Sequence, residues 1–342
     1  MKFPSGPGWR DGIGDAAWAP SAARDALRLR AWLNRLVREF FHARGVLEVE
    51  TPILSAAGNT EPNIDSFQAR FSGHVDAGSA LRWLRTSPEY PLKRLLAAGV
   101  GDCYELGRVF RNGEAGGCHN PEFSMLEWYR VGWDHLRLAE ETVELVQQAL
   151  ALGGRRAEVV STTYRELFVQ GAGVDPFAAS DAQLQAPLRG FGIDGEGLCR
   201  DDWLDLLMTH RIQPDFPADR ITVVHDWPAS QCALAKIRAP AAGSGVPAVA
   251  ERFELYLGRF ELANGYHELT DAAEQRARFE RDNRVRTGRG AVQPPLDEHL
   301  LAALAAGLPG CAGVAVGIER LLMAMLGSER IADVLAFDFA RA

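Results

Sequence analysis

The fold is decided by residues 108–130, which read RVFRNGEAGGCHNPEFSMLEWYR. Apolar and aromatic residues alternate on both sides of a polar, glycine-rich segment at 112–120, so we predict two strands joined by a loop. Period-two alternation puts four side chains on one face of the second strand: Phe123, Met125, Glu127 and Tyr129. A buried carboxylate is costly unless a cation or hydrogen-bond donors meet it. Glu127 therefore indicates either a pocket for a positively charged group or an internal ion pair with a nearby arginine.

The composition is that of a folded globular protein, with 47% apolar and 24% charged residues. A formal net charge of −8 argues against extended nucleic-acid binding. Five scattered cysteines without CxxC spacing favour reduced thiols in a cytoplasmic protein over disulfides or a zinc site. There is no signal-like apolar segment at the start and no apolar run of about 18 residues, so we expect neither export nor a membrane helix.

Hydrophobic periodicity and turn residues predict the other elements. Helices are expected from Ser21 to a stop at Gly45, at 134–152, 164–169 and 202–210, and at 272–287 with an arginine-rich, solvated face. Strands are expected at 46–49, 82–85 and 221–226, and a flexible loop at 239–247.

A helix start is predicted at residues 86–89. Thr86 and Glu89 could form a capping box, or Ser87 could cap a helix that has Pro88 in its first turn. The helix would run to about Ala98. Its N-terminus would also offer free N–H groups to an anion, although capping alone explains these residues.

A second informative stretch, residues 258–269, carries Glu261 and Glu268 on either side of Asn264-Gly265. Seven residues apart, the two glutamates would face opposite sides of an unbroken strand. A tight turn at Asn264-Gly265 would place them directly opposite each other, and a bulge would return them to one face. Converging carboxylates need a cation, which predicts a site for Mg²⁺ or for a substrate ammonium group. The alternative is a solvent-facing hairpin with two unrelated glutamates.

Residues 108–130 resemble the second signature motif of class II aminoacyl-tRNA synthetases in its lysine-type form, with Arg111-Asn112 before the loop and residues 119–123 after it. The ending at 126–130 is more similar to a paralogous family, the elongation factor P lysine ligases. Residues 310–323, a buried strand, a glycine hinge and an apolar helix, resemble the third motif.

The predicted helix after Ser21, with the strand and Glu50-Thr51-Pro52 that follow, resembles the first motif, whose helix lies at a dimer interface. Without the resemblance it is only an amphipathic helix. The resemblance implies an α+β fold, the class II catalytic fold, with a mainly antiparallel β-sheet flanked by helices. We expect a flexible arm at residues 1–20, a single catalytic domain at 21–342 and a homodimer.

The resemblance also assigns roles to residues. For ATP it implies Arg111, Asn112, Gly113, Glu114, Asn120, Phe123, Glu261, Leu262, Gly317 and Arg320. For the amino-acid substrate it implies Ser87, Pro88, Glu89, Glu127, Tyr129, Glu268 and Ala315. Arg111 and Arg320 would be catalytic, near the α- and γ-phosphates, and Glu261 and Glu268 would hold Mg²⁺.

Two positions distinguish this chain within the resemblance. Gly113 stands where the synthetases usually have a glutamate near the adenine amino group, so that contact is expected from Glu114 or from backbone groups. Ala315 stands where lysyl-tRNA synthetases usually have glycine and the elongation factor P ligases have alanine, and its methyl group would reshape the amino-acid pocket.

The implied reaction is ATP-dependent activation of lysine or (R)-β-lysine as an adenylate. Arginine side chains and a bound Mg²⁺ ion would stabilise the negative charge that develops on the departing pyrophosphate. About 20 residues before the first motif leave no room for an anticodon-binding barrel, so we expect the acceptor to be the ε-amino group of a lysine on elongation factor P and expect no stable tRNA binding. The alternatives are a tRNA ligase without an anticodon domain and a regulator that binds amino acids without catalysis.

Overall fold

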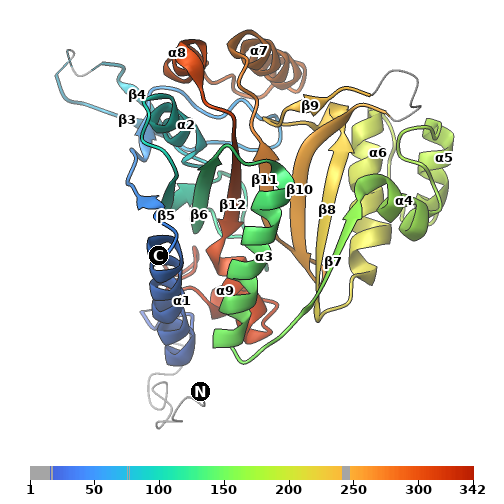
Figure 1. The fold of residues 1–342 in the computed structure, drawn as a ribbon, viewed down its shortest axis with the longest axis horizontal. Helices are drawn as coiled ribbons and strands as arrows, with labels where there is room; N and C mark the ends of the chain where they lie inside the picture. Colours follow the sequence, from blue (N-terminus) through green and yellow to red (C-terminus); the bar gives the residue numbers. More distant parts are fainter. Residues whose placement is uncertain (1–15, 17, 75, 77, 241–246) are drawn as a thin grey trace.

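The computed structural model describes residues 16, 18–74, 76, 78–240 and 247–342, and its centre is a nine-stranded sheet (Figure 1). The strands run in the order β1-β5-β6-β12-β11-β10-β8-β7, and β9 pairs with β10. The edge pairs β1–β5 and β7–β8 are parallel, and the pairs between them are antiparallel. A small antiparallel sheet has the order β2-β4-β3. The predicted α+β architecture, with a mainly antiparallel sheet, is confirmed.

The strands are β1 (Leu47–Glu48), β2 (Leu54–Ser55), β3 (Gln68–Arg70), β4 (Leu81–Leu84), β5 (Cys103–Phe110), β6 (Glu122–Val131), β7 (Glu158–Thr163), β8 (Arg220–Pro228), β9 (Ile237–Arg238), β10 (Val249–Leu257), β11 (Phe260–His267) and β12 (Cys311–Gly317). The helices are α1 (Arg24–His42), α2 (Glu89–Ala97), α3 (His135–Leu152), α4 (Tyr164–Ala172), α5 (Asp181–Gln185), α6 (Arg200–Leu207), α7 (Ala272–Gly288), α8 (Glu298–Gly307) and α9 (Ile318–Leu326).

Three helices, α1, α3 and α9, cover one face of the large sheet, and the main apolar core lies between them and the strands (Figure 1). Leu29, Leu33 and Val37 of α1 are fully buried there, as their helical spacing predicts. Each such side chain contributes roughly 1.5–3 kcal/mol by leaving water. The other face of the sheet is therefore free to line a cavity.

The central hairpin shows how the sequence separates these two faces. Leu126 and Trp128 of β6 point into the apolar core and are fully buried, whereas Glu127 and Tyr129, which alternate with them, line the cavity on the other face. The predicted strands on either side of the 112–120 loop are confirmed as β5 and β6.

The first helix begins at Arg24 rather than at Ser21, and Ala23 provides no side-chain cap. The segment before it is held by the end of the chain: the N–H groups of Ser21 and Ala22 donate to the carbonyls of Ala336 and Leu335, at 2.7 and 2.9 Å. Ala19, which falls within the predicted arm, is only 4% exposed. Residues 1–15 and 17 lie outside the described part, as do 241–246 of the predicted loop.

The arginine-rich face of α7 is not simply solvated, as the sequence suggested. Arg278 is 3% exposed and donates to the carbonyls of Ala233 and Ala235. Arg286 is 2% exposed. Its guanidinium donates to Asp65 and to four carbonyls, those of Thr60, Glu61, Ile64 and Val292. One arginine side chain can bind several backbone carbonyls at once because its five N–H donors lie in one rigid plane. These two residues fasten the loops beside the cavity.

Candidate active site

A cavity of about 1150 Å³ lies on the face of the sheet that α1, α3 and α9 leave uncovered. Most of the predicted site residues line it: Ser87, Glu89, Arg111, Glu114, Asn120, Phe123, Glu127, Tyr129, Glu261, Leu262, Glu268, Ala315, Gly317 and Arg320. Pro88, Asn112 and Gly113 are not part of its lining. The structure thus brings segments from four separate parts of the chain into one site.

Glu127 forms the acidic floor of the cavity together with hydroxyl groups. Its carboxylate accepts hydrogen bonds from Ser87 Oγ at 2.6 Å and from the Tyr129 hydroxyl at 2.8 Å. Burial, and repulsion from Glu89, raise the pKa of Glu127 to about 8 although both hydrogen bonds oppose this shift. In the described part of the chain no arginine pairs with Glu127, so the structure favours the pocket interpretation over the internal ion pair.

Lys93, which the sequence analysis did not single out, lies between two further carboxylates. Its ammonium group is 2.6 Å from Oε1 of Glu89 and 2.6 Å from Oε2 of Glu268. Burial disfavours the charge of Lys93, but the two glutamates together raise its pKa. Burial raises the pKa of Glu268 to about 7 while Lys93 opposes the shift. The spacing of Glu89 and Lys93, four residues apart at a helix start, was the available signal.

Of the two caps expected at the start of α2, the Thr86–Glu89 capping box does not form, and the Ser87 hydroxyl holds the first turn instead. The N-cap position is Pro88, and the Glu89 N–H donates to Ser87 Oγ at 3.0 Å. Thr86 instead accepts from the Asn59 side chain. Ser87 therefore links the helix start to Glu127, because its hydroxyl both accepts from Glu89 N–H and donates to the Glu127 carboxylate.

Two small residues of β12 shape the amino-acid end of the cavity. A Cβ at Gly313 would lie 2.3 Å from the Tyr129 ring and 2.5 Å from a Glu268 oxygen, so only glycine leaves these groups in position. Ala315 is paired with Glu127 of β6 on one side and Asn264 of β11 on the other. Its methyl group therefore lies on the cavity wall between a carboxylate and an amide.

Two arginines stand at the opposite end of the cavity. Arg320, in the first turn of α9, donates to the Glu261 carbonyl at 3.0 Å and lies 2.8 Å from Nε2 of His119. Burial, and the charge of Arg320, lower the pKa of His119. Arg111 stacks over the Phe123 ring at 5.2 Å, and its Nε has no hydrogen-bond partner among the described residues. Each arginine also lies near a carboxylate, Arg111 at 3.8 Å from Glu114 and Arg320 at 3.6 Å from Glu261, and Arg111 Nε leaves donor capacity for an anion.

The predicted pairing of Glu261 with Glu268 is wrong. No turn interrupts β11 at Asn264-Gly265, since the strand runs to His267 and pairs with both β10 and β12. The bulge lies instead at Leu262, where Tyr256 pairs with Glu261 and Leu255 with Ala263. It returns both glutamates to the cavity face, but about seven extended residues, roughly 20 Å, still separate them. One ion cannot bridge them.

The carboxylate beside Glu261 is that of Glu254, on β10, which sequence reasoning missed. Glu254 is 4% exposed and accepts hydrogen bonds from Arg252 and from the Tyr256 hydroxyl. Burial raises the pKa of Glu254 to about 7, Arg252 opposes the shift, and the negative charge of Glu261 adds to it. Beside them, Asn264 Oδ1 is buried without a hydrogen-bond partner in the described chain. Two carboxylates and a free amide oxygen are ligands that suit Mg²⁺.

Two of the predicted residues outside the cavity, Asn112 and Gly113, shape the loop between β5 and β6. Asn112 is exposed, and its N–H donates to the Asp65 carbonyl at 2.7 Å. Gly113 has a φ of +83°, a conformation that favours glycine over the glutamate of the resembled synthetases. Glu114 does face the cavity, 3.8 Å from Arg111.

A third missed residue, Glu319, connects the three motif segments. Its carboxylate, 1% exposed, lies 2.8 Å from Arg30 of α1 and accepts from the Ser124 N–H of β6 at 2.8 Å. Because Glu319 directly precedes Arg320, this contact fixes the helix turn that carries the arginine. Its partners lie almost 200 or more positions away in the sequence, so spacing could not have revealed them.

The fold and the site have the features of one known class. The family model described as "tRNA synthetases class II (D, K and N)" matches residues 17–341. The chain therefore belongs to the class II tRNA synthetase family.

Relatives within that class carry a more particular name. The chain is 49% identical over 323 residues to the elongation factor P--(R)-beta-lysine ligase of Mannheimia succiniciproducens, which covers 94% of this chain and 97% of that protein. It is 47% identical over 330 residues to the proteins of that name from Pectobacterium atrosepticum and Salmonella arizonae, with 95% and 96% of this chain and 98% and 99% of theirs covered. The resemblance to the elongation factor P ligases is confirmed.

None of the helices in the described residues combines the length and the apolar character that crossing a membrane requires.

Proposed function

We propose that this chain activates (R)-β-lysine with ATP and transfers it to the ε-amino group of a lysine on elongation factor P. The observation that carries the proposal is the charge arrangement of one cavity, with Arg111 and Arg320 at one end and, at the other, Glu127 together with the two carboxylates that contact Lys93. The names of the relatives agree with this activity.

The acidic end fits a substrate with two ammonium groups. Glu89, Glu127 and Glu268 carry three negative charges when ionised, and Lys93 neutralises one of them. The remaining two match the two ammonium groups of lysine or β-lysine. The Glu127 carboxylate accepts hydrogen bonds from the Ser87 and Tyr129 hydroxyls and pairs with no cation of the protein in the described residues, so it is placed to accept a substrate N–H. Buried carboxylates are stable as anions only with such a partner.

The basic end fits the triphosphate. In the activation step an oxygen of the substrate carboxylate forms a bond to the α-phosphorus, and the bond to pyrophosphate breaks. Arg111 and Arg320 would neutralise the anions that approach and the charge that leaves. In the transfer step the lysine amine of the acceptor bonds to the carbonyl carbon, AMP departs, and the amine loses a proton.

We further propose that Glu254 and Glu261 hold Mg²⁺, with Asn264 Oδ1 close by. Bound there, the ion would supply charge neutralisation at the phosphate oxygens. Glu268 would take no part in this, because Lys93 already neutralises it and it lies at the far end of β11. The adenine contact would come from Glu114 or from backbone groups of the 112–120 loop.

Exposed apolar side chains support the expectation of a homodimer. Leu47 of β1, Ile53, and Leu54 of β2 are 53, 39 and 51% exposed, and they lie next to the segment that resembles the first motif. Clustered exposed apolar residues on an edge strand commonly mark an interface. Light scattering at micromolar concentration should report twice the monomer mass, and the monomer mass would contradict this expectation. We also keep the cytoplasm as the expected location.

The acceptor assay tests the function. ATP–pyrophosphate exchange should depend on (R)-β-lysine, and labelled β-lysine should appear on elongation factor P and not on tRNA. Preference for α-lysine with labelling of tRNA would establish the truncated tRNA ligase instead. Absence of exchange with either amino acid would support the regulator.

A further inference from the structure

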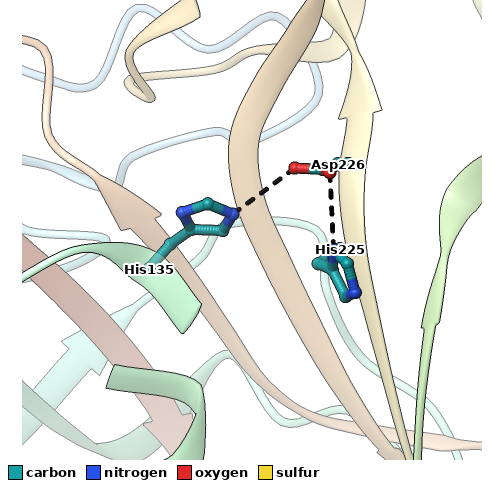
Figure 2. A group of neighbouring side chains, drawn as sticks. All are labelled: His135, His225 and Asp226. Carbon is teal, nitrogen blue, oxygen red and sulfur yellow. Dashed lines mark ion pairs between the residues drawn. The ribbon is translucent and has the colours of Figure 1, made fainter. Parts of the chain in front are cut away.

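A second cluster of potential ligands lies outside the cavity, between α3 and β8 (Figure 2). His135 is the first residue of α3, and His225 and Asp226 are consecutive residues of β8. His135 Nε2 lies 3.5 Å from Oδ1 of Asp226, and His225 Nδ1 lies 3.6 Å from its Oδ2. One ligand atom from each residue falls within 4.8 Å of the other two.

A break in the pleat of β8 makes this cluster possible. Consecutive residues of a regular strand point to opposite faces, yet His225 and Asp226 meet at 3.6 Å. The register of β8 against β10 shifts here, so that Asp226 stands opposite both Glu251 and Arg252. Asp226 itself has a φ of +59°, in the left-handed region that is uncommon for residues other than glycine but that asparagine and aspartate enter more often than most. The backbone is thus shaped around this carboxylate.

Several atoms of the cluster are buried without a partner. His135 is 2% exposed, and neither of its ring nitrogens has a hydrogen-bond partner in the portion of the chain described. The same holds for Nδ1 of His225 and Oδ1 of Asp226. Separations of 3.5 and 3.6 Å exceed those of good N–H···O hydrogen bonds. Buried polar atoms that converge in this way are costly unless something binds between them.

We propose that His135, His225 and Asp226 bind one transition-metal ion, for which Zn²⁺ is the best match. Zn²⁺ takes imidazole and carboxylate ligands at about 2.0–2.2 Å in tetrahedral geometry, which places neighbouring ligand atoms about 3.3 Å apart. The separation of His135 Nε2 from Oδ1 of Asp226, 3.5 Å, is a few tenths of an ångström longer. His225 lies 3.6 Å from the other carboxylate oxygen, and one ligand atom from each of the three residues falls within 4.8 Å of the others, so closure on an ion needs a rotation of the His225 and Asp226 side chains. A water molecule would complete the tetrahedron.

The surroundings agree with a cation at this position. Arg238 holds Oδ2 of Asp226 at 2.7 Å, which orients the carboxylate and leaves Oδ1 for the ion. Arg238 also lies 3.2 Å from Glu251, and Glu166 of α4 interacts electrostatically with His225. These two carboxylates help to balance the positive charges of Arg238 and of a bound ion.

The bound ion would join two elements that lead into the active site. α3 follows directly from β6, which carries Glu127 and Tyr129, and β8 continues into Trp227, which lines the cavity. The ion would stabilise this junction without touching the reactants, and the inference does not depend on the proposed ligase activity.

Metal content and affinity test the proposal in the full-length protein. After treatment with EDTA, the protein is given Zn²⁺, freed of excess ion and analysed by mass spectrometry of the metal. We expect one Zn²⁺ per chain, a higher Tm, and visible d–d absorption of the tetrahedral type with Co²⁺. His225→Gln and His135→Gln should each weaken Zn²⁺ binding by about 100-fold or more in competition with a chromophoric chelator, since each removes one of three ligands.

Matched variants distinguish Zn²⁺ bound at this cluster from Zn²⁺ bound elsewhere on the chain. Asp226→Asn keeps the shape of the side chain and should also lose the Zn²⁺-dependent rise in Tm. His42→Gln, at an exposed histidine, and Glu261→Gln, in the cavity, should both retain one Zn²⁺ per chain. Substoichiometric Zn²⁺ in the wild type would overturn the proposal, and so would the same affinity in folded His225→Gln and His135→Gln proteins.

Discussion

Lys93 Nζ lies 2.6 Å from Oε2 of Glu268, and both side chains are 1% exposed. The second partner of the ammonium group, Glu89, lies equally close. An ammonium group is thus built into the wall of a pocket that we propose for a substrate carrying ammonium groups. Lys93 neutralises one of the three negative charges at the acidic end, which leaves two for the substrate. It also fixes the orientation of the Glu89 and Glu268 carboxylates.

Lys93→Met tests the internal cation. Removing one partner of a buried ion pair typically costs about 3–5 kcal/mol, so the unfolding free energy should fall by this amount. Added lysine or β-lysine should raise the Tm of the variant more than that of the wild type, because a substrate ammonium group can partly replace the lost charge. Differential scanning fluorimetry with Lys236→Met, at an exposed lysine, provides the comparison. An unchanged Tm in Lys93→Met would contradict the role of this ion pair.

The raised pKa of Glu127 predicts a pH dependence of binding. A carboxyl group with a pKa of about 8 is mostly protonated at about pH 6 in the empty pocket, and must lose its proton to pair with an ammonium group. The KM for the amino acid should therefore fall as the pH rises from about 6 to about 8, and level off above. Glu268, with a pKa of about 7, contributes to the lower part of this range.

The same pKa has the opposite effect on the stability of the free protein. Between the ordinary glutamate pKa near 4.5 and the raised value near 8, the folded protein keeps a proton that the unfolded chain releases. The unfolding free energy should therefore decrease as the pH rises through this window. Glu127→Gln should remove the part of both dependences that extends to about pH 8, and should leave the part below about pH 7 that comes from Glu268. If the pH profiles of KM and of unfolding in this variant match those of the wild type, another group is responsible.

Glu254 of β10, which lies beside Glu261, and Glu268, which directly follows β11, should respond differently to loss of the carboxylate. Glu254→Gln should raise the Mg²⁺ concentration needed for half-maximal pyrophosphate exchange by at least about tenfold, because it removes a proposed ligand. Glu268→Gln should instead raise the KM for the amino acid and leave the Mg²⁺ requirement unchanged. Titrations of both variants with Mg²⁺ and with β-lysine decide the matter. A Mg²⁺ defect in Glu268→Gln would restore the pairing that the sequence suggested.

Ala315→Gly tests the shape of the amino-acid pocket. Removing the methyl group between Glu127 and Asn264 enlarges the wall at this point. One methyl group changes discrimination by about 1–3 kcal/mol, so the ratio of kcat/KM for α-lysine over β-lysine should rise by roughly tenfold or more. Ala291→Gly, outside the cavity, should leave the ratio unchanged. An unaltered ratio in Ala315→Gly would remove this residue from specificity.

The sequence predicted best what depends on local periodicity. Alternation placed Glu127 and Tyr129 on one face of β6, and helical spacing placed Leu29 and Leu33 in the core. These patterns hold because a strand or helix fixes the side-chain direction regardless of its neighbours. The arginines Arg111 and Arg320 came from motif resemblance, and both line the cavity.

What the sequence did not predict depends on pairing between distant segments. Glu254 reaches Glu261 only through the register of β10 against β11, and Lys93 meets Glu268 across 175 positions of chain. Arg286 can be buried because its guanidinium donates to backbone carbonyls that lie more than 200 positions away in the sequence. A turn at Asn264-Gly265 was a reasonable local choice, but two neighbouring strands hold that dipeptide extended. Tertiary context overrode the turn preference.

The bulge at Leu262 determines which face of the sheet each later side chain of β11 points to. Leu262 and Ala263 both turn toward the apolar layer, at 2 and 1% exposure, and this single extra residue keeps Glu261 in step with Asn264, Tyr266 and Glu268. Deleting Leu262 would exchange the two faces of the strand on one side of the deletion. The side chains of either the phosphate end or the amino-acid end of the site would then point into the apolar core. The length of this segment is therefore as strictly determined as its chemistry, and an insertion or deletion here would do more damage than most substitutions.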